Sequence, residues 1–191
     1  MKTNHFDSFL KKYNDCVIGW CGNGDYGTAY HTKNNLIIKE TTDNEEYFLA
    51  TLLIGAENNY IVNILDTEIL QNGSLIILME TVETPSYIED LWNEIELKRN
   101  CYETPLYQLD SEEFTETLSQ QAEHMLSDIS SAVYEFQKKI GFNPIDIKWD
   151  NIGIKSESGN FCLIDQKDFC QNDQRFIEMF NTYFIENQKY L

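Results

Sequence analysis

Residues 143–168 read N-P-I-D-I-K-W-D-N-I-G-I-K-S-E-S-G-N-F-C-L-I-D-Q-K-D and contain the most informative motif of the chain. Asp146 and Asn151 form the pattern D-x-x-x-x-N, and Asp165 follows later. Between Asn151 and Asp165, the apolar runs I-G-I and F-C-L-I flank an S-G-N turn, which predicts a β-hairpin. A D-x-x-x-x-N pattern alone is also typical of a solvated loop. Because a hairpin follows the pattern and ends next to Asp165, we expect the carboxylates of Asp146 and Asp165 and the amide of Asn151 to lie near one another.

The chemistry of phosphoryl transfer requires these residue types. Transfer of a γ-phosphoryl group needs Mg²⁺ with hard oxygen ligands, and a carboxylate that orients the attacking hydroxyl. The side chains of Asn151 and Asp165 suit the metal, and Asp146 suits the hydroxyl. Lys148 lies between the two motif residues, where its charge suits the negative charge of the transferred group.

A second motif, G-x-G-x-x-G, is formed by Gly22, Gly24 and Gly27. It is ambiguous between a dinucleotide-binding turn that opens a helix and a phosphate-binding loop between two strands. The residues after it are strand-like, pass through an Asn-Asn turn and end in the apolar run 36–38 before Lys39. This succession favours the second type of loop, whose backbone amides can approach phosphates because glycine lacks a side chain.

Together, these motifs resemble those of the protein-kinase-like family. P-I-D-I-K-W-D-N stands where H-R-D-L-K-P-E-N is usual, and D-Q-K at Asp165 stands where D-F-G is usual. The resemblance covers residues 17–168 and implies an α+β, bilobal fold in a single minimal kinase domain of residues 1–191. The expected N-lobe, residues 1–82, is small and β-rich, with one helix besides a short N-terminal helix. The expected C-lobe, residues 83–191, is reduced and mainly helical.

The resemblance also implies a role for each candidate site residue. The expected ATP-binding residues are the glycine loop and its flank, a phosphate-binding lysine with its acidic partner, and residues around the adenine: Gly22, Gly24, Gly27, Ala29, Lys39, Glu46, Met79, Glu80 and Val82. Met79 as ordinary core is equally compatible with the pattern. The expected catalytic residues are Asp146 and Lys148, and the expected Mg²⁺ ligands are Asn151 and Asp165.

The acidic partner of the lysine depends on the face of a helix predicted over residues 43–57. Thr42 or Asp43 could cap this helix. Its apolar stripe consists of Leu49, Leu52, Leu53 and Ala56. Glu46 shares this face through its i, i+3 and i+7 spacing and is preferred over Glu45. Either glutamate could instead be a first-turn acid favoured by the helix dipole.

The remaining elements follow from hydrophobic periodicity and turn residues. Two further strands are predicted at residues 60–70 and 74–80, on either side of an Asn-Gly turn. Helices are predicted at residues 5–14, 86–97, 112–140 and 172–190, and a loop at residues 99–109. Gly141 should end the longest of these helices.

The composition indicates which kinds of partner and which cellular compartment are expected. The 191 residues carry a formal net charge of -18, which disfavours nucleic acid and anionic membranes and favours basic partners or simply solubility. The five cysteines form no C-x-x-C pair, so we expect a reduced, cytoplasmic environment, in the producing cell or a host, without disulfides or structural zinc. No apolar run approaches the roughly eighteen residues of a membrane-spanning helix, and a soluble chain is expected.

Departures from the family pattern shape the expected regulation. Pro144 and Ile145 replace the usual His-Arg, and Gln166 and Lys167 replace Phe-Gly, so no arginine is placed to read activation-loop phosphorylation. No A-P-E follows, and only one further helix is expected after residue 168. In lacking an activation loop and most of the C-lobe, the sequence is similar to the minimal kinases that bacterial pathogens inject, the OspG and NleH group. A phage product or another compact viral kinase stays open.

The sequence therefore predicts an ATP- and Mg²⁺-dependent minimal kinase that phosphorylates a protein Ser or Thr hydroxyl, in preference to Tyr. Its expected partners are a protein substrate and an activating host or cellular protein, and the oligomeric state is left open. Three alternatives remain: a pseudokinase that sequesters a partner protein, a phosphotransferase for a small molecule, and a nucleotidyl transferase.

Overall fold

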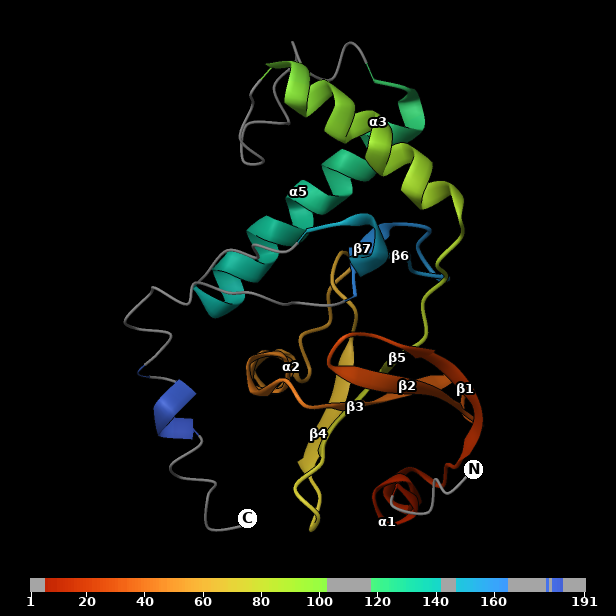
Figure 1. Ribbon diagram of the computed structural model, residues 1–191, viewed down its shortest axis with the longest axis vertical. Coiled ribbons are helices and arrows are strands. Elements are labelled where there is room, and N and C mark those ends of the chain that lie inside the picture. The colour runs from red at the N-terminus through yellow and green to blue at the C-terminus, as the bar shows by residue number, and fades with distance from the viewer. Residues whose placement is uncertain (1–5, 103–117, 142–146, 165–177, 179, 184–191) are drawn as a thin grey trace. The chain divides into compact units, whose positions relative to one another are not determined.

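The computed structural model describes residues 6–102, 118–141, 147–164, 178 and 180–183, and the chain folds into two compact units (Figure 1). Unit 1 consists of Met1–Glu57, Asn63–Thr81 and Cys170–Leu191, and unit 2 of Asn58–Val62 and Val82–Phe169. The chain therefore passes from one unit to the other at 57/58, 62/63, 81/82 and 169/170. Each unit is assembled from stretches that are separate in the sequence.

A five-stranded antiparallel sheet forms the centre of unit 1, in the order β1-β2-β3-β5-β4 (Figure 1). The strands are β1 (Val17–Asn23), β2 (Gly27–Thr32), β3 (Leu36–Thr41), β4 (Ile64–Ile69) and β5 (Leu75–Glu80). The predicted succession of strand, glycine loop, strand, turn and strand is confirmed. Two turns use a left-handed backbone, at Asn35 with φ 59° and at Gly73 with φ 84°. Asn and Gly are the residues that adopt this conformation most readily.

The strand predicted at residues 60–70 begins only at Ile64, so the first part of that prediction is wrong. Ile61 instead forms a parallel bridge with Leu163 within unit 2. The Val62 N–H donates to Leu163 O at 2.9 Å, and the Leu163 N–H donates to Tyr60 O at 3.0 Å. These residues have strand-forming side chains, but their backbone partner is Leu163 of unit 2 and not a strand of the unit 1 sheet.

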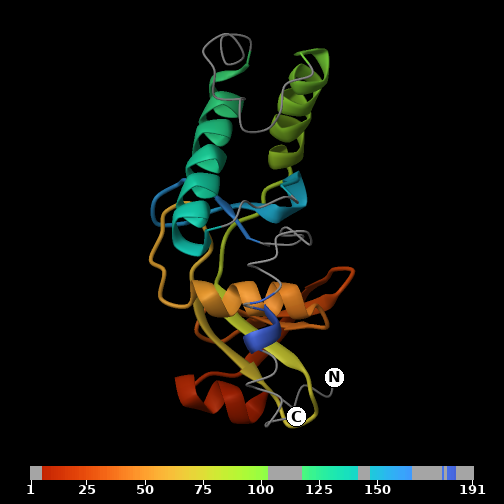
Figure 2. The ribbon, with the colours of Figure 1, turned by 90° about the vertical axis from the view of Figure 1, so that its left-hand side faces the viewer.

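Helix α1 (Asp7–Leu10) and the 3₁₀ helix η1 (Lys11–Tyr13) cover one face of the sheet, where the sequence predicts a short helix (Figures 1 and 2). Their apolar side chains join strand residues in one core cluster: Phe6, Phe9, Leu10, Ile38, Leu70, Ile76 and Leu78. The Tyr13 hydroxyl donates to Asp66 Oδ2 of β4 at 2.5 Å. The N-terminal helices are thus part of unit 1 through both apolar and polar contacts.

Helix α2 (Asn44–Leu53) covers the opposite face of the sheet (Figure 2). Asp43 caps it, because its Oδ1 accepts the N–H groups of the first turn at 2.8 and 3.2 Å. The helix stops before the predicted residue 57 because Ile54 turns to an extended conformation and bridges Ile64. Gly55 follows with φ 68°, which is outside the helical region.

Helix α3 (Tyr87–Tyr102) opens the helical part of unit 2. It extends past the predicted end at residue 97, so the prediction of a loop at residues 99–109 is wrong for 99–102. Residues 103–109 lie outside the described part of the chain. The sequence after Leu97 shows no apolar stripe, so it gave no signal for a helix. Its residues still tolerate helical structure, and the helix that begins at Tyr87 can therefore extend through them.

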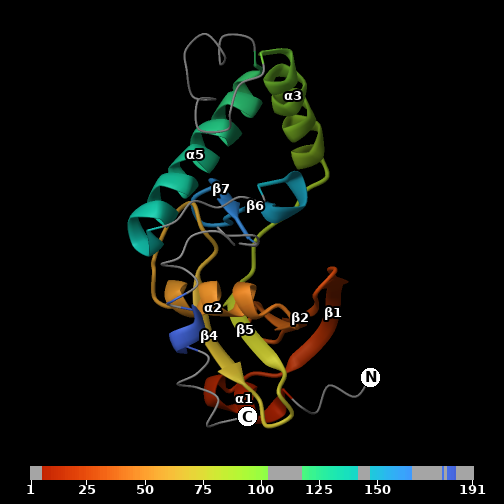
Figure 3. The same ribbon diagram turned by 60° about the vertical axis from the view of Figure 1, so that its left-hand side comes forward.

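Helix α5 (Gln120–Ile140) lies beside α3 (Figures 2 and 3). It begins later than the predicted residue 112: Leu118 and Ser119 are not helical, and residues 112–117 lie outside the described part. Ser119 caps the helix, and its Oγ also binds Glu94 Oε2 of α3 at 2.8 Å. Gly141 ends the helix with φ 86°, as predicted.

Strands β6 (Ile152–Ile154) and β7 (Phe161–Leu163) form the predicted hairpin in unit 2. The hairpin is fixed to α5 by Asp128, a buried residue whose Oδ2 accepts the N–H of Phe161 at 2.9 Å. His124 Nε2 lies 3.3 Å from the same oxygen. Burial raises the pKa of Asp128, against the opposing effects of the Phe161 amide and of His124.

The last predicted helix, residues 172–190, is described only at residue 178 and residues 180–183, which are helical. The rest of that prediction lies outside the described residues. Across the described part of the chain, no helix combines the length and the apolar character needed to span a bilayer.

Candidate functional site

Three candidate site residues line up across the sheet of unit 1. The register pairs Gly22 with Ala29, Ala29 with Lys39, and Lys39 with Ile77. Directly opposed residues of antiparallel strands point their side chains to the same face of the sheet. Lys39 therefore shares its face with two small residues, the glycine at the end of β1 and the alanine of β2.

Lys39 and Glu46 form an ion pair between β3 and α2. The Glu46 side chain is buried, with 5% of its residue surface exposed, and its Oε2 accepts a hydrogen bond from Thr41 Oγ1 at 2.7 Å. A buried carboxylate is costly unless it is paired and hydrogen-bonded. Both conditions are met, so Glu46 fixes the Lys39 amino group on the face of the sheet that α2 covers.

Thr41 belongs to this arrangement but was not identified from the sequence. Besides binding Glu46, it lies at the end of β3, next to Thr42, whose N–H and Oγ1 donate to Tyr26 O at 2.7 and 2.9 Å. These bonds connect the end of β3 to Tyr26 in the glycine loop. The position two residues after Lys39 puts both side chains on one face of the strand, and this spacing could have identified Thr41.

The three glycines of the loop differ in their surroundings. A Cβ atom at Gly27 would lie 2.3 Å from Glu40 O, so packing against β3 requires glycine there. At Gly22 and Gly24, no described atom lies within 4 Å of such a Cβ, and neither residue has a positive φ. Neither packing nor backbone conformation therefore requires glycine at these two positions.

The residues expected around the adenine lie at the end of β5 and just beyond it. Met79 is buried in β5. Glu80 is bound twice to Asn63: its N–H donates to Asn63 O at 3.0 Å, and its Oε1 accepts the Asn63 N–H at 2.7 Å. The Glu80 N–H is thus engaged within unit 1. Val82 is half-buried and begins a stretch of unit 2.

Unit 2 contains the described part of the predicted catalytic loop. Asn151 ends the 3₁₀ helix η3 (Trp149–Asn151) and is buried, with 6% of its surface exposed. Its N–H donates to Lys148 O at 3.0 Å, and its O accepts the N–H of Ile164 at 2.9 Å. Lys148 Nζ lies 3.5 Å from Asp150 Oδ2. The backbone of the loop is therefore fixed to the residue that follows β7.

Comparison with known proteins bears on the fold. No protein-family model matches the sequence, and no curated protein matches it. The solved structure of the Cydia pomonella granulovirus kinase PK-1 is similar, with a TM-score of 0.54 and 11% sequence identity. The match covers 87% of this chain, but only 59% of that chain. The fold is kinase-like. The likeness concerns the fold alone and leaves the roles of individual residues to be tested.

The kinase-like fold holds the described candidate residues in two groups. Lys39 and Glu46 are brought together within unit 1, and Lys148 and Asn151 within unit 2. Asp146 and Asp165 lie outside the described residues. Their roles therefore stay predictions.

The predicted Mg²⁺ site consists of Asn151, which the structure describes, and Asp165, which lies outside the described residues. Within the described ranges, no three His, Cys, Asp or Glu residues are grouped as metal ligands. The predicted ligand set combines the Asn151 amide with the carboxylate of Asp165, the residue after Ile164 in the sequence. Amide and carboxylate oxygens are the hard donors that Mg²⁺ prefers, so these residue types fit the metal.

Proposed function

We propose that this chain is an ATP- and Mg²⁺-dependent protein kinase. The observation that carries the proposal is the ion pair between Lys39 and Glu46 in a kinase-like fold. A lysine amino group oriented on the sheet beside a glycine loop is suited to bind the α- and β-phosphates of ATP. In this proposal Glu46 orients the amino group, and Thr41 orients Glu46.

The glycine loop supports the same assignment. Gly22 and Gly24 have no described neighbour that requires glycine, whereas a phosphate that closely approaches the backbone would require it. Ala29 is paired with Lys39 across β2 and β3, and its small side chain leaves room on that face. Met79, Glu80 and Val82 are assigned to the adenine, with Val82 offering its backbone groups.

The transfer step is assigned to the loop before the hairpin and to the residue after it. The acceptor hydroxyl oxygen bonds to the γ-phosphorus, the bond from that phosphorus to the β–γ bridging oxygen breaks, and ADP leaves. Asp146 orients the hydroxyl and accepts its proton, and Lys148 neutralises charge on the transferred group. Lys148 and Asp150 are 44% and 46% exposed, so their ion pair costs little to open.

Asn151 and Asp165 are assigned as the Mg²⁺ ligands. When bound, Mg²⁺ supplies charge neutralisation at the β- and γ-phosphates. The backbone bond from Ile164 to Asn151 supports this assignment, since it ties the amide ligand to the residue before Asp165.

The acceptor is proposed to be a Ser or Thr hydroxyl of a protein in the cytoplasm. The net charge of -18 favours encounter with a basic acceptor protein through long-range attraction. Activation by a partner protein is compatible with the absence of an arginine at position 145.

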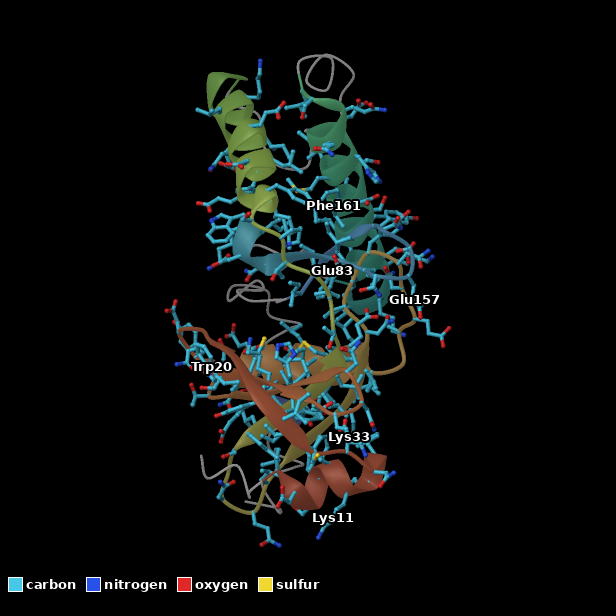
Figure 4. All side chains as sticks on the ribbon, turned by 90° about the vertical axis from the view of Figure 1, so that its right-hand side faces the viewer. Lys11, Trp20, Lys33, Glu83, Glu157 and Phe161 are labelled. Atoms are coloured by element: carbon cyan, nitrogen blue, oxygen red, sulfur yellow. The ribbon has the colours of Figure 1, made fainter. Side chains whose placement is uncertain are left out.

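Transfer of label from γ-labelled ATP, with Mg²⁺ and cell lysate, tests this function. The protein or discrete lysate bands should be labelled by the wild type and not by Asp146→Ala or Asp165→Ala. Lys33→Ala is the matched control, because Lys33 lies exposed in the turn between β2 and β3 (Figure 4). Label retained in both Asp variants would contradict the assignment. ATP binding without any transfer would favour the pseudokinase, and label from the α-phosphate would favour nucleotidyl transfer.

A further inference from the structure

Four aromatic rings connect α2 with residues near the end of the chain. Phe48 lies edge-on to Phe180, with the ring centroids 5.7 Å apart and the planes at 90°. Tyr183 lies 5.2 Å from Phe48 and 6.4 Å from Tyr47, between ring centroids. Such tilted and edge-to-face arrangements are favourable beyond the apolar area they bury. All four residues belong to unit 1. Phe180, Tyr183 and the residues between them are called the aromatic segment below.

The aromatic segment touches α2 next to the candidate site residue. Tyr47 and Phe48 directly follow Glu46 in α2, and each is only 2% exposed. A helix moves as a rigid rod over so short a distance, so a displacement of these two rings also displaces the Glu46 carboxylate. The contacts of the aromatic segment are therefore coupled to the distance between Glu46 and Lys39.

A polar contact accompanies the ring contacts. Burial and the neighbouring Tyr183 hydroxyl raise the pKa of Tyr47, so its hydroxyl remains neutral. Thr51 Oγ1 of α2 lies 3.0 Å from Thr67 Oγ1 of β4. Polar contacts thus accompany the ring contacts where α2 meets β4 and the aromatic segment.

The aromatic segment lies at the surface of unit 1. Phe180 and Tyr183 are half-buried, while Asn181 and Thr182 between them are exposed. Its contacts with α2 span more than 130 positions of sequence, so no local structure enforces them. A segment held by two half-buried rings can leave and return without global unfolding.

We propose that the aromatic segment is a positioning element for α2: its docking on Tyr47 and Phe48 holds Glu46 against Lys39. The occupant of this face of α2 is thus the chain's own residues 180–183. The effect on catalysis rests on the proposed function, whereas the docking of the aromatic segment on α2 is independent of it. Release of the segment lets α2 shift, separates Glu46 from Lys39 and weakens ATP binding and transfer.

The test compares the full-length double variant Phe180→Ala/Tyr183→Ala with the wild type. Amide hydrogen exchange of residues 44–53 in α2 should accelerate in the double variant, while the five-stranded sheet keeps its protection. The KM for ATP should rise by about fivefold or more, in the usual range of coupling between sites. Asn181→Ala is the matched control, because this side chain is exposed in the same segment.

A positioning role is separated from a merely structural one by the kinetic constants. Loss of folded protein lowers the apparent kcat and leaves KM unchanged, whereas a displaced lysine changes KM. The conservative variant Phe180→Leu/Tyr183→Phe keeps apolar volume at both positions and should restore most of the protection of α2 and of the KM. If the alanine variant lacks a cooperative thermal transition, Phe180→Ala alone supplies the test, because it removes the ring that packs on Phe48 and leaves Tyr183 in place.

Several outcomes would overturn the proposal. Unchanged exchange of residues 44–53 in the alanine variant means that the aromatic segment does not hold α2. Faster exchange with an unchanged KM and kcat means that docking has no bearing on Lys39. Failure of the proposed function itself is distinguishable: the wild type then transfers no label, while the exchange measurement still decides whether the segment docks.

Discussion

Glu46 reaches Lys39 from the first half of α2 while almost its whole surface is buried. The pair is thus a structural contact as well as a candidate part of the phosphate site. A carboxylate in this position needs its countercharge, because the lysine and the Thr41 hydroxyl offset the cost of removing it from water. The structural and catalytic contributions of the pair can be measured separately.

Replacing Lys39 by Met should lower the free energy of unfolding by about 3 to 5 kcal/mol, because the buried Glu46 carboxylate then loses the charge of the lysine. The double variant Lys39→Met/Glu46→Gln should recover most of this loss, since neither charge remains. Urea denaturation at neutral pH measures both, with Lys33→Ala as the control. A Lys39→Met protein as stable as the wild type would show that the pair is not buried in solution.

Substitutions in the glycine loop should distinguish the glycine needed for packing from the glycine needed for ATP binding. Gly27→Ala should destabilise the protein by about 1 to 3 kcal/mol, because its Cβ would overlap the carbonyl oxygen of Glu40. Gly24→Ala should leave the unfolding temperature nearly unchanged and raise the KM for ATP. Thermal denaturation and ATP titration of the two variants check these expectations. Equal stability of both would contradict the close approach at Gly27.

Asp128 should make the stability of the chain depend on pH. Burial raises its pKa above the ordinary 3.8, so the folded state holds the proton more tightly than the unfolded state. The stability contributed by this group is full below pH 3.8 and is lost as pH rises through its folded-state pKa. Asp128→Asn keeps an oxygen acceptor for Phe161 and does not titrate.

The unfolding free energy of Asp128→Asn relative to wild type should therefore increase as the pH rises above 3.8 and then level off. Urea denaturation between pH 3 and pH 7, with Glu123→Gln on the exposed side of α5 as control, measures this difference. The charge of His124 opposes the effect while it is protonated, so His124→Gln should enlarge it. A difference that does not vary with pH would rule out the shifted carboxyl.

Tyr13 should stabilise the N-terminal helices only while its hydroxyl is protonated. Burial and the bond to Asp66 raise its pKa from 10.0 to about 12. The stability contributed by the neutral phenol is full below pH 10.0 and is lost as pH rises through about 12. The difference between wild type and Tyr13→Phe should shrink over that range. Tyr134→Phe, at a residue 63% exposed, is the control and should show no such change.

Local sequence signals were sufficient for many elements of the fold. The Asn-Gly pair before β5 predicted the turn at Gly73, Asp43 was one of the two residues predicted as the cap of α2, and Gly141 predicted the end of α5. Each of these residues acts through its own backbone conformation or through an amide two or three positions away. Such local effects can be predicted from a few neighbouring residues in the sequence.

The ends of other elements depended on partners distant in the sequence. The extended conformation of Ile54 accompanies its bridge to Ile64, and the start of α5 accompanies the bond from Ser119 to Glu94. Residues 60–62 form strand-like contacts, but with Leu163. Hydrophobic periodicity identifies a face or a strand-forming stretch and does not identify its partner.

The candidate site likewise contains residues that local sequence signals identified and contacts that they did not. The order of the motifs led to Lys39, and the helix face led to Glu46; their pairing is observed, and their role in binding ATP stays a prediction. Thr41 was missed because no motif includes it. The contact of Phe180 with Phe48 was also missed, since the periodicity that predicted a helix at residues 172–190 does not identify the surface that the helix covers.

The interleaved composition of the two units constrains how this protein can be inherited and engineered. A gene cut after residue 81 would encode all five strands of the sheet but neither Phe180 nor Tyr183, which cover α2. The same cut would leave residues 60–62 without Leu163, their backbone partner. Neither unit can therefore be recombined as a contiguous module, and a shuffled or fused descendant must carry both units together.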